Sequence, residues 1–202
     1  MPFELLFLLS IAAGAIGAMT GLGGGGVLTA VLTMSGVDIK HAIAVSILSV
    51  IATSSGAASA YVRDRITNLK VGMFLEMFTI LGALAGAAIT LASGQRALFF
   101  IFGGVLLAIG AVVWKERKRG WKIAEAQDGF SRWLELDGSY FDKSEGKTIP
   151  YRGVRAYFGA PLMFGAGVVA GLLGIGAGAL KVLIFDVVMG FPPKVSTTTS
   201  NL

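Results

Sequence analysis

The stretch GAIGAMTGLGGGGVLTAVLTMSGVDIKHAIAVS, residues 14–46, decides the fold, because residues 167–200 repeat its pattern as GVVAGLLGIGAGALKVLIFDVVMGFPPKVSTTTS. Both stretches lie within long apolar runs. Four glycine pairs are equivalent: Gly14 and Gly167, Gly21 and Gly174, Gly23 and Gly176, and Gly25 and Gly178. The second copy then has one additional residue. After it, the equivalent positions are Gly36 and Gly190, Lys40 and Lys194, and Ser46 and Ser200. The chain therefore contains two internal repeats of one glycine-broken unit.

The composition is that of a membrane protein. Hydrophobic residues make up 54% of the 202 residues and charged residues 14%, whereas soluble domains carry about 25% charged residues. A soluble domain of this size could not bury so much apolar surface. We therefore predict an all-α fold, a polytopic bundle of transmembrane helices.

The residue types exclude several chemistries. Without cysteine there are no disulfides and no thiol chemistry, and with one histidine there is no His-rich metal site. An enzyme needs a nucleophile, an acid–base pair or a metal centre in mutual reach, and this sequence offers almost none of these groups. We expect no enzyme activity, no catalytic residues, no metal and no cofactor.

Several apolar runs have the length of a membrane span, and the two runs that contain the repeats are longer. The expected helices are 42–62, 71–92 and 97–114, with long runs at 5–35 and 156–191 and the start of a sixth span at 195–202. Because that sixth span is cut short, we expect the chain to lack C-terminal helices of the full protein. Residues 5–35 would form about 46 Å of helix, against about 30 Å of bilayer core.

The glycine run GLGGGG, residues 21–26, is the expected break in the first long segment, because glycine is a poor helix former. A single crossing would make the two repeats parallel, and a re-entrant hairpin would make them inverted. We favour the hairpin, because its half-helices would meet near the midplane, where irregular backbone is tolerated only around a cavity.

The chain divides into a first transmembrane repeat, 1–114, a polar loop, 115–155, and the start of an incomplete second repeat, 156–202. Ten of the seventeen basic residues lie in the polar loop. The positive-inside rule places the basic loops 63–70 and 115–155 in the cytoplasm of a multi-pass protein of the cell (inner) membrane. The same rule accounts for the net charge of +5 without a nucleic-acid partner. Residues 139–151 predict a small hairpin around a Ser-Glu-Gly turn, either a linker or a docking element.

Each glycine break is a candidate anion site, since it exposes backbone N–H groups and positive helix ends. The candidate backbone donors are Gly23, Gly24, Gly25, Gly26, Gly176, Ala177 and Gly178. Both breaks fit the dinucleotide fingerprint formally, but no strand precedes either copy. Close helix packing is the alternative, and it is the role we expect for the G-x-x-x-G pairs Gly17 and Gly21, Gly82 and Gly86, and Gly167 and Gly171.

Hydroxyl and amide side chains form a second set of candidates. Ser46 and Ser49 share a face of the 42–62 helix, and Thr199, Ser200 and Asn201 occupy the matching part of the second repeat. Neutral donors can bind an oxyanion without burying a full charge. Hydrogen bonding between helices is the alternative role.

Two ionisable side chains lie within apolar segments, where a charge is a functional candidate by default. Lys181 could attract an anion or extend to the interface. Glu76 is the candidate for proton coupling, or it is interfacial. Lys40 and Lys194 could funnel anions or anchor helix ends.

These motifs resemble the TauE/SafE family of sulfite exporters. The resemblance is carried by GLGGGG with AVSILSVIATSSGAASAY (44–61), by NLKVGMFLEMFTILGALAGA (68–87), and by GIGAGALKV (174–182) with GFPPKVSTTTSNL (190–202). The sequence departs at Ala177, where the family commonly has glycine. The resemblance implies a membrane protein that exports sulfite or organic sulfonates, with the substrate bound between the repeats.

Motifs and resemblance together predict a secondary transporter that exports a small anion, sulfite or an organic sulfonate, by alternating access at a site between two repeats. An anion channel and a non-catalytic subunit of a membrane complex remain alternatives. The expected partners are the small anionic substrate and the lipid bilayer, with no nucleic acid, and a homodimer is left open.

Overall fold

The computed structural model describes residues 3–21, 23–64, 66–116, 127–142 and 146–202. The basic start of the polar loop at 117–126 and the hairpin tip at 143–145 lie outside the described residues. The elements are α1 Phe3–Thr20, α2 Gly25–Met34, α3 Ile39–Arg63, α4 Leu69–Ala92, α5 Gln95–Glu116, α6 Gly129–Trp133, β1 Asp137–Asp142, β2 Lys147–Arg152, α7 Ala156–Leu173, α8 Gly178–Leu183, the π-helical turn η1 Ile184–Val188, and α9 Pro193–Thr199.

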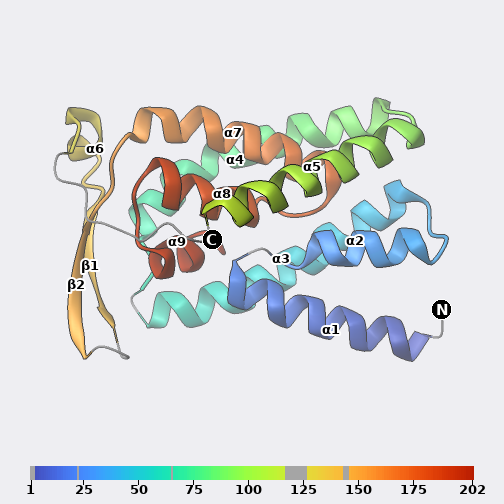
Figure 1. Ribbon diagram of the computed structural model, residues 1–202, viewed down its shortest axis with the longest axis horizontal. Coiled ribbons are helices and arrows are strands. Elements are labelled where there is room, and N and C mark those ends of the chain that lie inside the picture. Colours follow the sequence, from blue (N-terminus) through green and yellow to red (C-terminus); the bar gives the residue numbers. More distant parts are fainter. Residues whose placement is uncertain (1–2, 22, 65, 117–126, 143–145) are drawn as a thin grey trace.

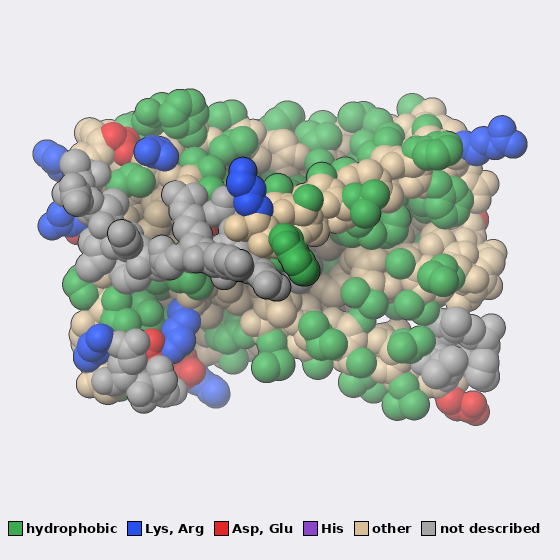
Figure 2. All heavy atoms as spheres, viewed as in Figure 1, with side chains coloured by type: hydrophobic (Ala, Val, Ile, Leu, Met, Phe, Trp, Pro, Cys, Tyr) green, Lys and Arg blue, Asp and Glu red, His purple; other side chains and the backbone are tan. Residues whose placement is uncertain are grey.

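The structure is a mostly helical bundle with long apolar helices. Among the described residues, four helices (α3, α4, α5 and α7) are long and apolar enough to cross a membrane. Their outer surfaces expose large hydrophobic side chains such as Leu48, Met73, Phe100 and Leu107. Figure 2 shows hydrophobic side chains over the middle of the molecule, while charged side chains gather mostly towards its two ends. This distribution is that of a polytopic membrane helix bundle.

The first glycine run breaks its segment at residues 21–24. Gly21, Gly23 and Gly24 have φ values of 73°, 74° and 71°, a left-handed conformation that glycine adopts without steric cost. The helix resumes at Gly25, so the break is shorter than the six glycine-rich residues predicted. Figure 1 shows α2 running back beside α1 towards the end at which the chain begins.

The second glycine run has the same backbone conformation at equivalent positions. Gly174 and Gly176 have φ values of 66° and 75°, and α8 begins at Gly178, the counterpart of Gly25. The second copy's extra residue falls in the segment that contains η1. A π-helical turn accommodates one more residue than an α-helical turn, so η1 absorbs the insertion. The next glycines, Gly36 and Gly190, again share a positive φ, 89° and 71°.

Helices α4 and α7 pack backbone against backbone through two interlocked glycine pairs. A Cβ placed on Gly82 or Gly86 would lie under 3.0 Å from a carbonyl of α7, and one on Gly167 or Gly171 equally close to a carbonyl of α4. The predicted role of these G-x-x-x-G pairs in close helix packing is confirmed. This contact fixes α4, which carries Glu76, against the helix that leads into the second break.

The described parts of the loop 63–70 and of the polar loop, residues 127–142 and 146–155, lie at one end of the bundle (Figure 1). The antiparallel hairpin of β1 and β2 follows the predicted segment 139–151 and packs beside the N-terminus of α4 (Figure 1). Asn68 Nδ2 donates to Tyr151 Oη at 3.1 Å, and Lys70 pairs with Glu135. At the opposite end, Lys40 Nζ donates to the Leu91 carbonyl at 3.1 Å. Sequence position alone did not reveal that the loop 63–70 and the hairpin form one surface.

Candidate functional site

A cavity of about 600 Å³ lies between the two glycine breaks. Its wall includes Gly21 and Gly23 from the first break and Gly176, Ala177 and Gly178 from the second. Faces of α3 and α4 complete most of the remaining wall, with Ala170 and Gly171 of α7 and the end of α9. The cavity is therefore built by both glycine breaks together with α3, α4, α7 and the residues that follow α9.

The two breaks are in direct contact. A Cβ placed on Gly25 would lie 2.6 Å from the Gly174 carbonyl oxygen and 3.2 Å from the Ile175 carbonyl carbon. Only glycine at position 25 leaves room for the backbone of the second break. The half-helices α2 and α8 consequently begin beside one another at the cavity.

Each break also lies against a helix that follows the other break along the chain. A Cβ on Gly21 would meet the Thr197 carbonyl oxygen at 2.9 Å, and one on Gly174 would meet the Ile43 carbonyl oxygen at 2.7 Å. Ile43 and Thr197 are equivalent positions, because each lies three residues before the matched serines of the two copies. The two contacts are thus the same contact made twice.

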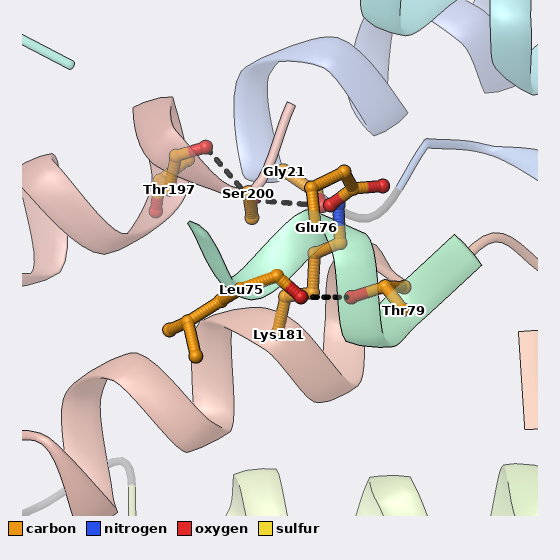
Figure 3. Close-up of polar contacts among 7 residues, drawn as sticks. All are labelled: Gly21, Leu75, Glu76, Thr79, Lys181, Thr197 and Ser200. Carbon is orange, nitrogen blue, oxygen red and sulfur yellow. Dashed lines mark hydrogen bonds and ion pairs between the residues drawn. The ribbon is translucent and has the colours of Figure 1, made fainter. Parts of the chain in front are cut away.

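Lys181 and Glu76 meet at the cavity wall. Lys181 Nζ forms an ion pair with Glu76 Oε2, and the two side chains are 7% and 28% exposed. Figure 3 shows Lys181 extending from α8 towards Glu76 on α4. Glu76 is therefore a cavity residue, and Lys181 does not extend to the molecular surface. The sequence named both residues but gave no reason to pair them.

The end of α9 joins the cavity to the first break. Ser200 Oγ donates to the Thr197 carbonyl at 2.8 Å and to the Gly21 carbonyl at 3.3 Å (Figure 3). Asn201 Nδ2 donates to the carbonyls of Thr197 at 3.0 Å and Ala18 at 3.4 Å. Both side chains line the cavity, but their hydrogens are already engaged with backbone carbonyls. They position the break as well as facing the cavity.

Several predicted site residues lie outside the cavity wall. Gly24 is the N-cap of α2, and Gly25 and Gly26 are its first two residues, none of them in the cavity lining that includes Gly23. Ser46 is fully buried and accepts a hydrogen bond from Thr29 Oγ1 at 2.8 Å. Ser49 and Thr199 are likewise absent from the lining, and Thr199 Oγ1 accepts from the Asn68 N–H at 3.1 Å. For Ser46 and Thr199 the contacts observed are between helices, the alternative that the sequence left open.

Other polar groups take their place. Ser54 and Ser55, further along α3, line the cavity, and so does Thr79, one turn beyond Glu76 on α4. The spacing of three residues between Glu76 and Thr79 could have indicated this shared face. The remaining wall is largely apolar, with residues such as Val50, Ile51, Ile80 and Leu84. Within the described part of the wall, Lys181 is thus the one cation, paired with Glu76, among apolar residues and a few hydroxyl groups.

Lys194 and Lys40 act at the helix ends. Lys194 Nζ binds both carboxylate oxygens of Asp142 at 2.7 Å, joining α9 to the hairpin. The hairpin also packs on the segment between η1 and α9 through Tyr151 and Phe191, whose ring centroids lie 5.5 Å apart. Among the described residues, no group of three or more His, Cys, Asp and Glu side chains could hold a metal ion.

Long apolar helices, an apolar outer surface and a cavity whose described wall carries one buried cation define a multi-pass membrane protein of the transporter class. The family model described as sulfite exporter TauE/SafE matches residues 6–202. The chain belongs to this family, as its glycine motifs predicted.

One curated relative supports the same class. The chain is 29% identical over 209 residues to the "Probable membrane transporter protein YunE" of Bacillus subtilis (strain 168), an alignment that covers 99% of this chain and 73% of that protein. No solved structure matches the chain. The protein is a membrane transporter and not an enzyme.

Proposed function

We propose that the protein is a secondary transporter that exports a small sulfur oxyanion, sulfite or an organic sulfonate, through the cavity between the two breaks. The observation that carries the proposal is Lys181, a cation with a 7% exposed side chain in the wall of an otherwise largely apolar cavity. A charge is expensive in such surroundings and marks a binding pathway. Membership of a family described by sulfite export favours a sulfur anion.

Backbone donors would complete the anion site. The first N–H groups of a helix have no partner within the helix, and α8 begins at Gly178 beside Lys181. Gly176, Ala177 and Gly178, with Gly23 across the cavity, would approach an oxyanion closely, because glycine and alanine present little side chain. Ser200 and Asn201 would hold the first break in place and face the substrate.

Inverted repeats would supply the movement. In Figure 1, α1 begins at one end of the bundle and α7 at the other, and each leads through its break into a half-helix that turns back. The matched contacts of Gly21 with Thr197 and of Gly174 with Ile43 support a pseudo-two-fold relation between the copies. Rocking of one repeat against the other would open the cavity to either side in turn.

The topology follows from the charge distribution. The loop 63–70 and the hairpin lie at one end and contact each other, and this end carries more of the described basic residues than the opposite end, where Lys40 and Arg96 lie. By the positive-inside rule we place it in the cytoplasm, with the protein in the cell (inner) membrane.

The test is flux of labelled sulfite, ethanesulfonate and sulfate by the full protein in proteoliposomes. We expect saturable flux that unlabelled substrate on the opposite side stimulates, and at least a tenfold loss in K181M with little loss in K70M, whose ammonium lies outside the cavity. A channel would show flux without such stimulation. Equal flux in K181M and wild type would overturn the assigned site.

A further inference from the structure

In the cavity wall, the ammonium of Lys181 is already paired with a carboxylate of the protein itself, that of Glu76. Among the described residues that line the cavity, these two are the only ones with ionisable side chains. Lys181 is 7% exposed, so its ammonium has little room for a second anionic partner while Glu76 holds it. A substrate anion that uses Lys181 must therefore compete with Glu76.

The neighbouring ionisable groups do not face this pair from the cavity. They are Lys70 on α4, Lys40, His41, Tyr61 and Arg63 on α3, Arg96 and Lys115 on α5, Tyr157 on α7, Asp186 on η1 and Lys194 on α9, and none of them lines the cavity. Lys70 pairs with Glu135 and Lys194 with Asp142, both at the hairpin end. Among the described residues of the wall, no second cation is therefore available to take over the Glu76 carboxylate.

Displacement of Glu76 would leave a carboxylate without a partner in a largely apolar wall, beside the incoming anion. An unpaired charge in low dielectric is strongly disfavoured, and two like charges at one site disfavour the ionised form further. Taking up a proton removes both penalties, because the neutral acid can remain in the cavity. The proton comes from the aqueous phase on the side from which the anion enters.

We infer that Glu76 is an internal competitor for Lys181, so that each anion is carried together with one proton. The inference rests on the proposed function and adds its coupling ion. In the loaded cavity, one proton is bonded to the Glu76 carboxylate and the anion occupies its place on Lys181. On the far side the anion and the proton both leave, and the ion pair re-forms. The net movement is one proton and one monovalent anion, so the cycle transfers no net charge.

The experiment measures proton and anion movement together in proteoliposomes that contain the full wild-type protein. The probes are labelled sulfite, ethanesulfonate and lactate, with a pH dye inside the vesicles and the membrane potential clamped by potassium and valinomycin. We expect about one proton per anion for ethanesulfonate and lactate, which stay monovalent, while labelled sulfite reports flux alone because its own protonation changes near neutral pH. Below saturation, we expect flux to be about tenfold faster for each pH unit by which the source side is acidified. An imposed membrane potential should leave the rate unchanged.

The variant E76Q removes the competing charge and the proton site. We expect its flux to lose the pH dependence, to carry no protons and to respond to membrane potential, and we expect its half-saturating anion concentration to fall. E135Q is the matched control, because it breaks the Glu–Lys pair outside the cavity, and its proton-to-anion ratio should remain about one.

Each outcome is decisive. A wild-type ratio near zero with saturable flux overturns the inference but leaves the proposed transporter standing, and this holds whether or not E76Q folds. Retained pH coupling in a folded E76Q also overturns it. Coupled flux of lactate alone supports the coupling but overturns the sulfur-anion assignment. Flux of no probe overturns the proposed function and the inference with it.

Discussion

Gly25 of the first break lies against Gly174 of the second, so closely that a Cβ on Gly25 would stand 2.6 Å from the Gly174 carbonyl oxygen. The same Cβ would lie 2.5 Å from Cγ2 of Val50. Contacts under 3.0 Å are not relieved without moving backbone or side chains. The meeting of two segments far apart in sequence thus depends on a residue without a side chain.

The first prediction concerns this contact. Gly25→Ala should destabilise the protein by about 1–3 kcal/mol, the usual cost of overpacking, and should impair transport, because it separates the two breaks. The neighbouring Gly26→Ala is the matched control. Its Cβ would meet Ile175 at an ordinary 3.4 Å, and alanine favours helix by about 0.5–1 kcal/mol. Thermal unfolding in detergent, followed by size-exclusion chromatography, measures both. Equal melting temperatures for the two variants would contradict the prediction.

The second prediction concerns the interlocked glycines of α4 and α7. Gly86→Ala should lower stability by about 1–3 kcal/mol, because its Cβ would press on the Val168 carbonyl across the interface. Gly165→Ala lies on α7 with no atom within 4 Å of its Cβ, so it should be neutral or slightly stabilising. The same unfolding assay ranks the two variants, and a loss in Gly165→Ala as large as that in Gly86→Ala would refute the explanation.

The third prediction concerns the attachment of the hairpin to α9. Asp142 is buried, and Lys194 binds both of its oxygens at 2.7 Å. Breaking a fully buried pair costs about 3–5 kcal/mol; because Lys194 is half exposed, we expect about 1–2 kcal/mol from Lys194→Met. Hydrogen exchange in β1 and β2 should accelerate accordingly.

A double variant provides the control for this pair. Asp142→Asn removes the buried charge, so the combination with Lys194→Met should cost less than the sum of the two single changes. Additive costs would show that the two side chains do not stabilise the hairpin through each other.

The fourth prediction is a pH dependence at the start of α6. Burial raises the pKa of Asp128, but hydrogen bonds from Ser131 and from the Arg155 N–H outweigh it and hold the pKa below its ordinary value. The backbone nitrogen of Arg155 lies 2.6 Å from Asp128 Oδ1. Arg155 itself has a φ of 56°. Since the folded pKa is the lower one, the carboxylate stabilises this loop above the unfolded pKa, and the contribution is lost as the pH falls through the folded pKa.

Hydrogen exchange of residues 128–136 and 153–157, corrected for intrinsic rates, measures this effect. We expect wild-type protection to fall on acidification, and Asp128→Asn to have the reduced protection already at neutral pH. A variant with the same pH profile as the wild type would assign the effect to another group.

The sequence by itself determined the membrane class, the spans and the backbone of the breaks. Apolar runs of span length predict α3, α4 and α5 because helix length and bilayer thickness are fixed quantities. Glycine at matched positions predicts matched left-handed turns, since glycine occupies that conformation without steric cost. The G-x-x-x-G spacing of Gly82 and Gly86, and of Gly167 and Gly171, likewise predicted a close contact between helices. This prediction was possible because residues four apart share one face of a helix, which is a local property of the sequence.

Only the tertiary structure decided which side chains share the cavity. Ser46 and Ser54 lie on one helix and look alike in sequence, yet Ser46 is buried against Thr29 and Ser54 faces the cavity. Lys181 and Glu76 are 105 positions apart in the numbering (181 minus 76), and no local rule pairs them. Their contact follows from the packing of α4 on α7 and from the reversal at the second break, which are long-range relations that periodicity and propensity do not encode.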